Sequence, residues 1–118
     1  DFMHRVRQPF NANVLAQAAA LAALDDEEFR ERTLAVVAEG LAFLHKSLNS
    51  LGLEYVPTQT NFFLIRIPGG GKRLYESMLK EGVIIRAMDS YGLKDYIRIS
   101  VGTESENRRF MDTLKKFI

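Results

Sequence analysis

The sequence predicts an α/β chain of the α+β type, with long helices first and a small helix-covered sheet after them. Apolar side chains recur at three- and four-residue steps across residues 26–51, which is typical of one face of a long helix. Three short runs rich in β-branched or aromatic residues follow, within residues 57–67, 83–85 and 96–101. The order strand, helix, strand, strand, helix indicates a split βαβ unit. In such a unit the third strand pairs between the first two, and we expect the helices on one face of the sheet.

The first half of the chain is expected to hold two helices after a short entry segment. Residues 1–7 resemble the end of a helix, and Pro9 stops it because proline disfavours helical geometry in the preceding residue. Asn11 or Asn13 then caps a helix that continues to Leu24, since an asparagine oxygen can accept a free backbone N–H.

The long helix of residues 26–51 begins after a pair of aspartates. Gly40 weakens it without ending it. Gly52 stands where a left-handed C-terminal cap would stop it. The strand of residues 57–67 ends at a proline and three glycines, and a helix over residues 73–81 follows.

Residues 82–103 predict a β-hairpin with a long connection, its strands at residues 83–85 and 96–101. A final helix, capped by Thr103 or Ser105, is expected to run to Ile118. Its Phe110 and Leu114 should face inward, and residues 107–109 outward.

Composition excludes several classes of function. The 118 residues carry 16 basic and 15 acidic side chains interleaved along the chain, so we expect no nucleic-acid partner and no membrane contact. The chain has no cysteine, and its apolar run at residues 14–24 is too short to span a bilayer, which favours a cytoplasmic location. The first residue is Asp1 rather than methionine, so the natural start is expected upstream.

Common catalytic and metal-binding patterns are also missing from the sequence. His4 and His45 lie far apart with no second ligand at helical spacing, so no metal site is predicted. The PGGGKR stretch lacks the spacing of a phosphate-binding loop, because Lys72 is followed by Arg73 rather than by serine or threonine.

Two arginines are the strongest candidates for a binding site. Arg86 closes the first strand of the predicted hairpin and Arg98 lies within the second, so the hairpin could bring both to one end of the sheet. Two interpretations stay open. Each guanidinium could lie on the solvated face or pair with Asp89 or Asp95, or both could bind an anionic ligand.

Three stretches of the chain resemble the C-terminal region of histidinol-phosphate aminotransferases, which are fold-type-I enzymes that use pyridoxal phosphate (PLP). They are RQPFNANVLAQAAALAAL near the start, PTQTNFFLIRI in the middle, and GVIIR followed by YIRISVGTESEN in the hairpin. The blocks occur in the family's order and cover nearly the whole chain.

The resemblance implies roles for individual residues. Arg98 would bind the anionic group of the substrate. Arg86 would also bind the substrate, at the phosphate end of that molecule. Asn61 would lie near the mouth of the active site. It also implies that residues 1–51 are connecting helices and that residues 52–118 form the small C-terminal domain.

The resemblance further implies which parts of the enzyme this chain lacks. No lysine here matches the context of the residue that forms the Schiff base with PLP, so we expect no catalytic and no cofactor-binding residue in this chain. The 118 residues alone should therefore be inactive.

The parent protein would be a homodimer that exchanges an amino group between histidinol phosphate and the glutamate/2-oxoglutarate pair. Two alternatives remain: another aminotransferase or a threonine-phosphate decarboxylase of the same subfamily, or a non-enzymatic interaction module.

Overall fold

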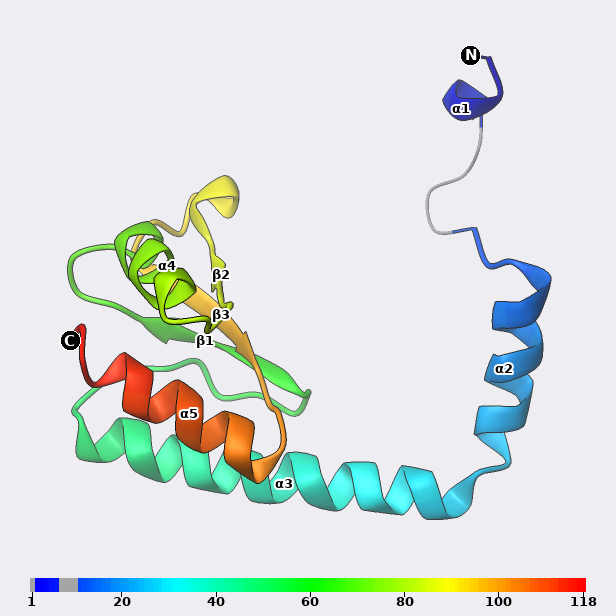
Figure 1. The fold of residues 1–118 in the computed structure, drawn as a ribbon, viewed down its shortest axis with the longest axis horizontal. Helices are drawn as coiled ribbons and strands as arrows, with labels where there is room; N and C mark the ends of the chain where they lie inside the picture. The colour runs from blue at the N-terminus through cyan, green and yellow to red at the C-terminus, as the bar shows by residue number, and fades with distance from the viewer. Residues whose placement is uncertain (1, 7–10) are drawn as a thin grey trace. The chain divides into compact units, whose positions relative to one another are not determined.

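The computed structural model describes residues 2–6 and 11–118, and the chain divides into two compact units, Asp1–Thr33 and Leu34–Ile118. The first unit holds α1 (Phe2–Val6), α2 (Val14–Leu24) and the first turns of α3 (Glu27–Ser50). The second holds the rest of α3, then β1 (Phe62–Arg66), α4 (Gly71–Lys80), β2 (Arg86–Ala87), the 3₁₀ turn η1 (Asp89–Tyr91), β3 (Tyr96–Ser100) and α5 (Glu104–Leu114) (Figure 1).

Helix α2 is capped by Asn13 rather than Asn11. The Asn13 Oδ1 atom accepts a hydrogen bond from the backbone N–H of Ala16 at 2.8 Å. Gln17 is the only polar side chain of the helix, yet none of the helix residues is buried. The predicted stop at Pro9 lies outside the described residues. Within the described part of the chain, every helix is too short or too polar to cross a membrane.

Helix α3 ends at the glycine that the sequence predicts. Gly52 has a φ of +66°, which a residue without Cβ adopts without steric cost. The Leu53 N–H donates to the Leu48 carbonyl and the Gly52 N–H donates to the Asn49 carbonyl, both at 3.1 Å. These two bonds form a Schellman motif and satisfy carbonyls that the helix leaves free.

The boundary between the two units differs from the one that the sequence predicts. The prediction separates residues 1–51 from residues 52–118, whereas the structure separates the chain within α3, before Leu34. The reason is packing: Leu44 and Leu48, in the second half of α3, are fully buried in the core of the second unit. How the domains of a longer protein divide stays a prediction.

The sheet has the predicted topology. Its order is β1-β3-β2, and β3 pairs antiparallel with both neighbours, so the third strand lies between the first two. Strand β1 is shorter than predicted and begins at Phe62.

The prediction of a strand at residues 83–85 is wrong. Gly82 (φ +73°) ends α4 in a tight turn, with the Val83 N–H donating to the Met78 carbonyl. Pairing begins only at Arg86, and Ile84 stays 79% exposed. Residues 83–85 are therefore β-branched but have no neighbouring strand with which to pair.

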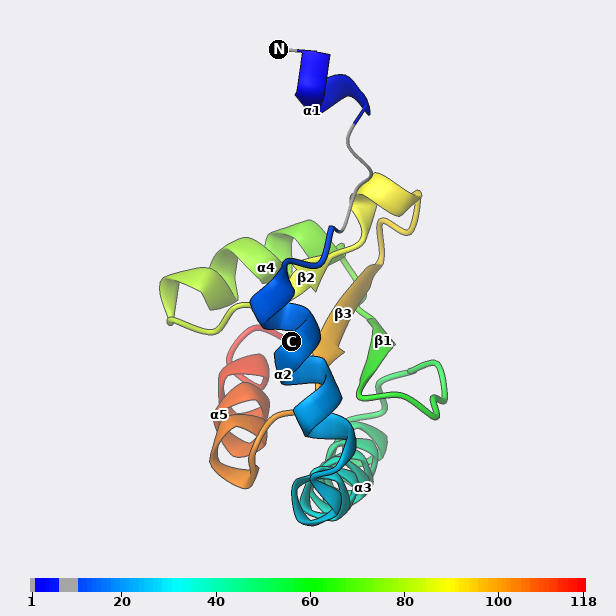
Figure 2. The ribbon, with the colours of Figure 1, turned by 90° about the vertical axis from the view of Figure 1, so that its right-hand side faces the viewer.

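All helices of the second unit cover one face of the sheet, as predicted. The side chains of β1 and β3 that point to this face are Phe63, Ile65, Ile97 and Ile99, and all are buried. They form one core with residues of three helices: Leu44 and Leu48 of α3, Leu74 and Met78 of α4, and Phe110, Met111 and Leu114 of α5. Figure 2 shows α4 and α5 on the same side of the strands. The opposite face is therefore free to carry polar side chains.

Candidate functional site

The two arginines lie directly opposite each other in the sheet. Strand β2 pairs with β3 in a register that makes Arg86 and Arg98 partners. Residues opposite each other in an antiparallel pair point to the same face, with Cβ atoms about 4.5–5.5 Å apart. Like charges in this position destabilise a sheet, so the pairing needs a compensating anion or a functional reason.

An aromatic ring supports each guanidinium. The Arg98 Cζ atom lies 5.1 Å from the centre of the Phe62 ring, one diagonal step away across β1. The Arg86 Cζ atom lies 5.3 Å from the centre of the Tyr91 ring, and its Nη2 donates to the Tyr91 hydroxyl at 3.0 Å. Such cation–π contacts hold a guanidinium in place without neutralising its charge.

Neither arginine forms an ion pair with a carboxylate among residues 2–6 and 11–118. The interpretation that Asp89 or Asp95 pairs with them therefore does not apply. Arg66, on the same face of β1, contrasts with them because its Nη1 lies 3.1 Å from Glu54 Oε2. The charges of Arg86 and Arg98 remain available to a ligand.

A surface pocket of about 700 Å³ opens beside the arginine pair, where the chain before β2 separates from β3. Both arginines line it, together with residues 82–85, residues 99–102 and the first turns of α5. A guanidinium offers a planar fork of N–H donors that suits carboxylate or phosphate oxygens. The geometry fits an anionic small molecule.

The turn that follows β3 is fixed by side chains of α5. Asn107 accepts from the Gly102 N–H at 3.0 Å and donates to the Gly102 carbonyl at 2.9 Å. The prediction that Asn107 faces outward is wrong, because this residue is only 4% exposed. The Asn107 amide thus serves as the hydrogen-bond partner of both backbone polar groups of Gly102. In return, Gly102 satisfies the polar groups of the buried Asn107 side chain.

Thr103, not Ser105, caps α5, which ends at Leu114 rather than at the predicted Ile118. The backbone N–H and the hydroxyl of Thr103 donate to Glu106 Oε2 at 2.8 and 2.7 Å, and these bonds lower the pKa of the Glu106 carboxyl. The strand that carries Arg98 thus leads into a firmly held turn.

Asn61 does not line the arginine pocket, although its backbone bonds to Val101, which does. Its carbonyl accepts the Val101 N–H at 2.8 Å, which extends the ladder between β1 and β3 by one residue. The residue is exposed and does not line the pocket. Its role in substrate binding stays a prediction, as do those of Arg86 and Arg98.

Sequence reasoning missed the two aromatic supports, Phe62 and Tyr91. A signal for Phe62 was available, because it alternates with Leu64 along β1 and so shares the open face. Tyr91 lies in the hairpin connection, where no periodicity predicts which way a side chain turns.

The fold and the site together define a small α/β domain in which two arginines face each other on neighbouring strands. The family model described as "Aminotransferase class I and II" matches residues 1–114, so the chain belongs to this family.

Individual relatives agree with this assignment. The histidinol-phosphate aminotransferase of Nitratidesulfovibrio vulgaris is 47% identical over all 118 residues, which correspond to 32% of that protein. The one from Desulfotalea psychrophila is 52% identical over 112 residues, 95% of this chain and 30% of the relative. This chain therefore spans about a third of the length of the curated relatives it matches.

Solved structures show the same fold. The histidinol-phosphate aminotransferase from Clostridium acetobutylicum matches 97% of this chain and 36% of its own, with a TM-score of 0.80 and 29% identity. The L-threonine-O-3-phosphate decarboxylase from Porphyromonas gingivalis also matches 97% of this chain and 37% of its own, with a TM-score of 0.72 and 29% identity.

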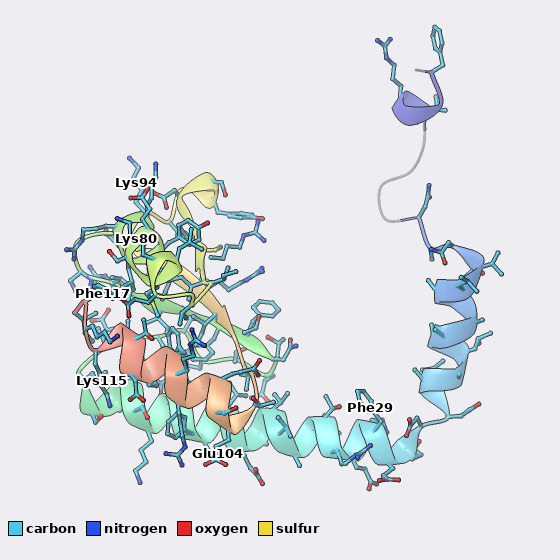
Figure 3. All side chains as sticks on the ribbon, viewed as in Figure 1. Phe29, Lys80, Lys94, Glu104, Lys115 and Phe117 are labelled. Atoms are coloured by element: carbon cyan, nitrogen blue, oxygen red, sulfur yellow. The ribbon has the colours of Figure 1, made fainter. Side chains whose placement is uncertain are left out.

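Enzymes of this family generally depend on PLP, but the described residues do not fit a PLP site of their own. A PLP enzyme needs a lysine for the Schiff base. All six lysines of this chain are exposed, and none lines the arginine pocket. Figure 3 labels three of them, Lys80, Lys94 and Lys115, in the second unit.

Proposed function

We propose that this chain is the substrate-binding C-terminal part of a longer, PLP-dependent histidinol-phosphate aminotransferase. The whole protein would exchange an amino group between histidinol phosphate and the glutamate/2-oxoglutarate pair. The observation that carries the proposal is the pairing of Arg86 and Arg98, which have no acidic partner in the described part of the chain, together with relatives that bear this name.

The substrate that this proposal names suits the site. Histidinol phosphate carries a phosphate, and 2-oxoglutarate carries two carboxylates, so both present anions to the same pair of arginines. Arg98, half-buried on the central strand, and Arg86, at the more exposed edge, would together hold the single phosphate of histidinol phosphate, and each would hold one carboxylate of 2-oxoglutarate. Orientation matters because a bound substrate reacts only when the bond to be broken is correctly placed.

The cofactor would be held by residues outside this chain, because the lysines present do not fit that role. The part of the reaction that this chain performs is to bind and orient the substrate. The prediction of a cytoplasmic location belongs to the same proposal.

The experiment is a substrate panel on the whole protein that contains this chain. Histidinol phosphate with 2-oxoglutarate should give glutamate, whereas the isolated 118-residue chain should give none, even with added PLP. The proposal is wrong if the whole protein transfers no amino group from any phosphorylated donor. Turnover by the isolated chain would contradict the assignment of the cofactor site to other residues.

A second candidate is a decarboxylase of threonine phosphate, favoured by the structural likeness to the Porphyromonas gingivalis enzyme. Its substrate carries a carboxylate as well as a phosphate, and an arginine pair can bind either anion, so the pair does not distinguish the two functions. The same panel does: release of carbon dioxide from threonine phosphate, without glutamate formation from histidinol phosphate, would identify the decarboxylase.

A further inference from the structure

We propose that Tyr91 is a positioning residue that orients Arg86 and so determines how tightly the anion at that end of the site is bound. This inference rests on the proposed function, in which Arg86 and Arg98 bind the anionic groups of the substrate. It adds a residue that the sequence motifs did not indicate.

Tyr91 holds Arg86 by two contacts at once. Its hydroxyl accepts from Arg86 Nη2 at 3.0 Å, and its ring lies beneath the guanidinium at 5.3 Å from Cζ. A guanidinium on a flexible side chain loses rotamer freedom when it binds a ligand, and these contacts remove part of that freedom in advance. Binding of the anion is correspondingly tighter.

The chemistry of Tyr91 suits this role better than that of an acid. A carboxylate next to Arg86 would neutralise the charge that must attract the anion, whereas a phenol accepts the hydrogen bond and remains neutral. Asp89 lies two residues from Tyr91 in the same turn, yet it forms no ion pair with Arg86 in the described structure.

The turn that carries Tyr91 is well held. The N–H groups of Tyr91 and Leu93 both donate to the carbonyl of Met88, at 3.0 and 3.2 Å. Met88 is itself only 8% exposed, and its N–H donates to the Tyr96 carbonyl of β3 at 3.1 Å. Gly92 completes the turn with a φ of +77°. The turn that carries Tyr91 is therefore hydrogen-bonded to β3, the same strand that carries Arg98.

Tyr91 does not line the pocket itself, so its effect must pass through Arg86. This separates it from a residue that touches the substrate. It also predicts that a change of Tyr91 no longer affects substrate binding when Arg86 is replaced by a residue that cannot make the same contacts with Tyr91.

The test is a double-mutant cycle in the whole protein, with histidinol phosphate as the probe. Tyr91→Phe removes the hydroxyl and keeps the ring, and it should raise KM about 3- to 10-fold, the effect of one lost hydrogen bond. The kcat should stay within about twofold, since substrate binding rather than the chemical step is affected. In an Arg86→Lys background, Tyr91→Phe should cause no further rise.

Tyr96→Phe is the matched control, because Tyr96 is half-buried on β3 opposite Arg66 and does not line the pocket. It should leave KM unchanged. Equal thermal midpoints for Tyr91→Phe and the unchanged protein should show that folding is intact, since Tyr91 is 60% exposed.

The outcomes separate this inference from the function on which it rests. An unchanged KM for Tyr91→Phe, or an equal rise in both backgrounds, would overturn the role of Tyr91. If Arg98→Lys weakens binding and Arg86→Lys does not, the inference fails and the proposed function stands. If neither arginine variant weakens binding, the proposed function fails as well.

Discussion

His45 is a titratable side chain in an unusual position. Its ring stacks on Tyr55 with centroids 4.3 Å apart and meets the edge of Phe63 at 5.1 Å. Its Nε2 atom is buried and has no hydrogen-bond partner within the described residues. Burial lowers the pKa of the imidazole below its ordinary value of 6.5.

This position predicts a pH dependence of stability. Because the pKa is lower in the folded chain, the unfolded chain binds more protons between the folded pKa and 6.5. The free energy of unfolding should be highest above pH 6.5 and should fall as the pH drops through that window.

Urea unfolding of the isolated chain between pH 7.5 and pH 5.5 measures this effect. The decrease should disappear in His45→Phe, which keeps an aromatic ring against Tyr55 and Phe63. It should persist in His4→Gln, which changes the only other histidine of the chain. A decrease that survives in His45→Phe would assign the titration to another group.

Among the secondary-structure elements, α3 and the turn after β3 approach each other closely at Gly40. A Cβ atom on Gly40 would overlap Cγ1 of Val101 and lie 2.8 Å from Nδ2 of Asn107. Figure 1 shows α5 lying along the second half of α3. The sequence indicates only that Gly40 weakens the helix, and the structure gives the reason for a glycine there.

Gly40→Ala should therefore destabilise the chain. Better helix propensity contributes about 1 kcal/mol in favour of alanine, whereas steric overlap in a packed contact costs about 1–3 kcal/mol, and here it involves two neighbours. We expect a net loss of up to about 2 kcal/mol in the free energy of unfolding.

Chemical denaturation measures this loss, and a second variant shows its cause. Val101→Ala combined with Gly40→Ala should cost less than the sum of the two single changes, because it removes the overlapping methyl group. Additive costs would mean that the overlap is relieved in some other way.

Whether the sequence predicts an element correctly depends on whether that element is set by neighbouring residues or by pairing with a distant part of the chain. The caps of α2 and α3 follow from local chemistry: the sequence predicts Gly52, and it leaves Asn11 and Asn13 as alternatives, of which the structure shows Asn13. The prediction of a strand at residues 83–85 was wrong. β-branched residues indicate a strand only where a neighbouring strand is in register to pair with them, and here pairing begins at Arg86.

The candidate site divides in the same way. The arginines and their hairpin could be read from the sequence, since both lie in regular motifs. The burial of Asn107 could not, because it depends on the backbone of Gly102, and the Tyr91 contact depends on the path of an irregular turn.

At the scale of the whole molecule, the feature that bears on assembly is the surface of α2. The helix is apolar apart from Gln17, and its large side chains, such as Leu21 at 68%, are exposed. A helix of this kind is normally buried. The proposal of a homodimeric parent protein would account for it.

If the whole protein is the predicted homodimer and α2 lies in its interface, Leu21→Glu should convert it into monomers, since the change places a charge in an apolar interface. Gln17→Glu, on the same helix, should have a smaller effect because this position is already polar. Sedimentation equilibrium measures the change. A Leu21→Glu protein that folds and remains dimeric would show that α2 is covered within one subunit instead.

The most direct test of the central claim is the kcat/KM of the whole protein for histidinol phosphate when Arg98 is changed to lysine. Lysine keeps the charge but loses the planar fork of donors, and lost hydrogen bonds between charged groups should lower kcat/KM about 10- to 100-fold. Arg66→Lys, on the same face of β1 but paired with Glu54, should leave it unchanged. An unchanged kcat/KM in Arg98→Lys, or an equal loss in Arg66→Lys, would contradict the assignment of the arginine pair to substrate binding.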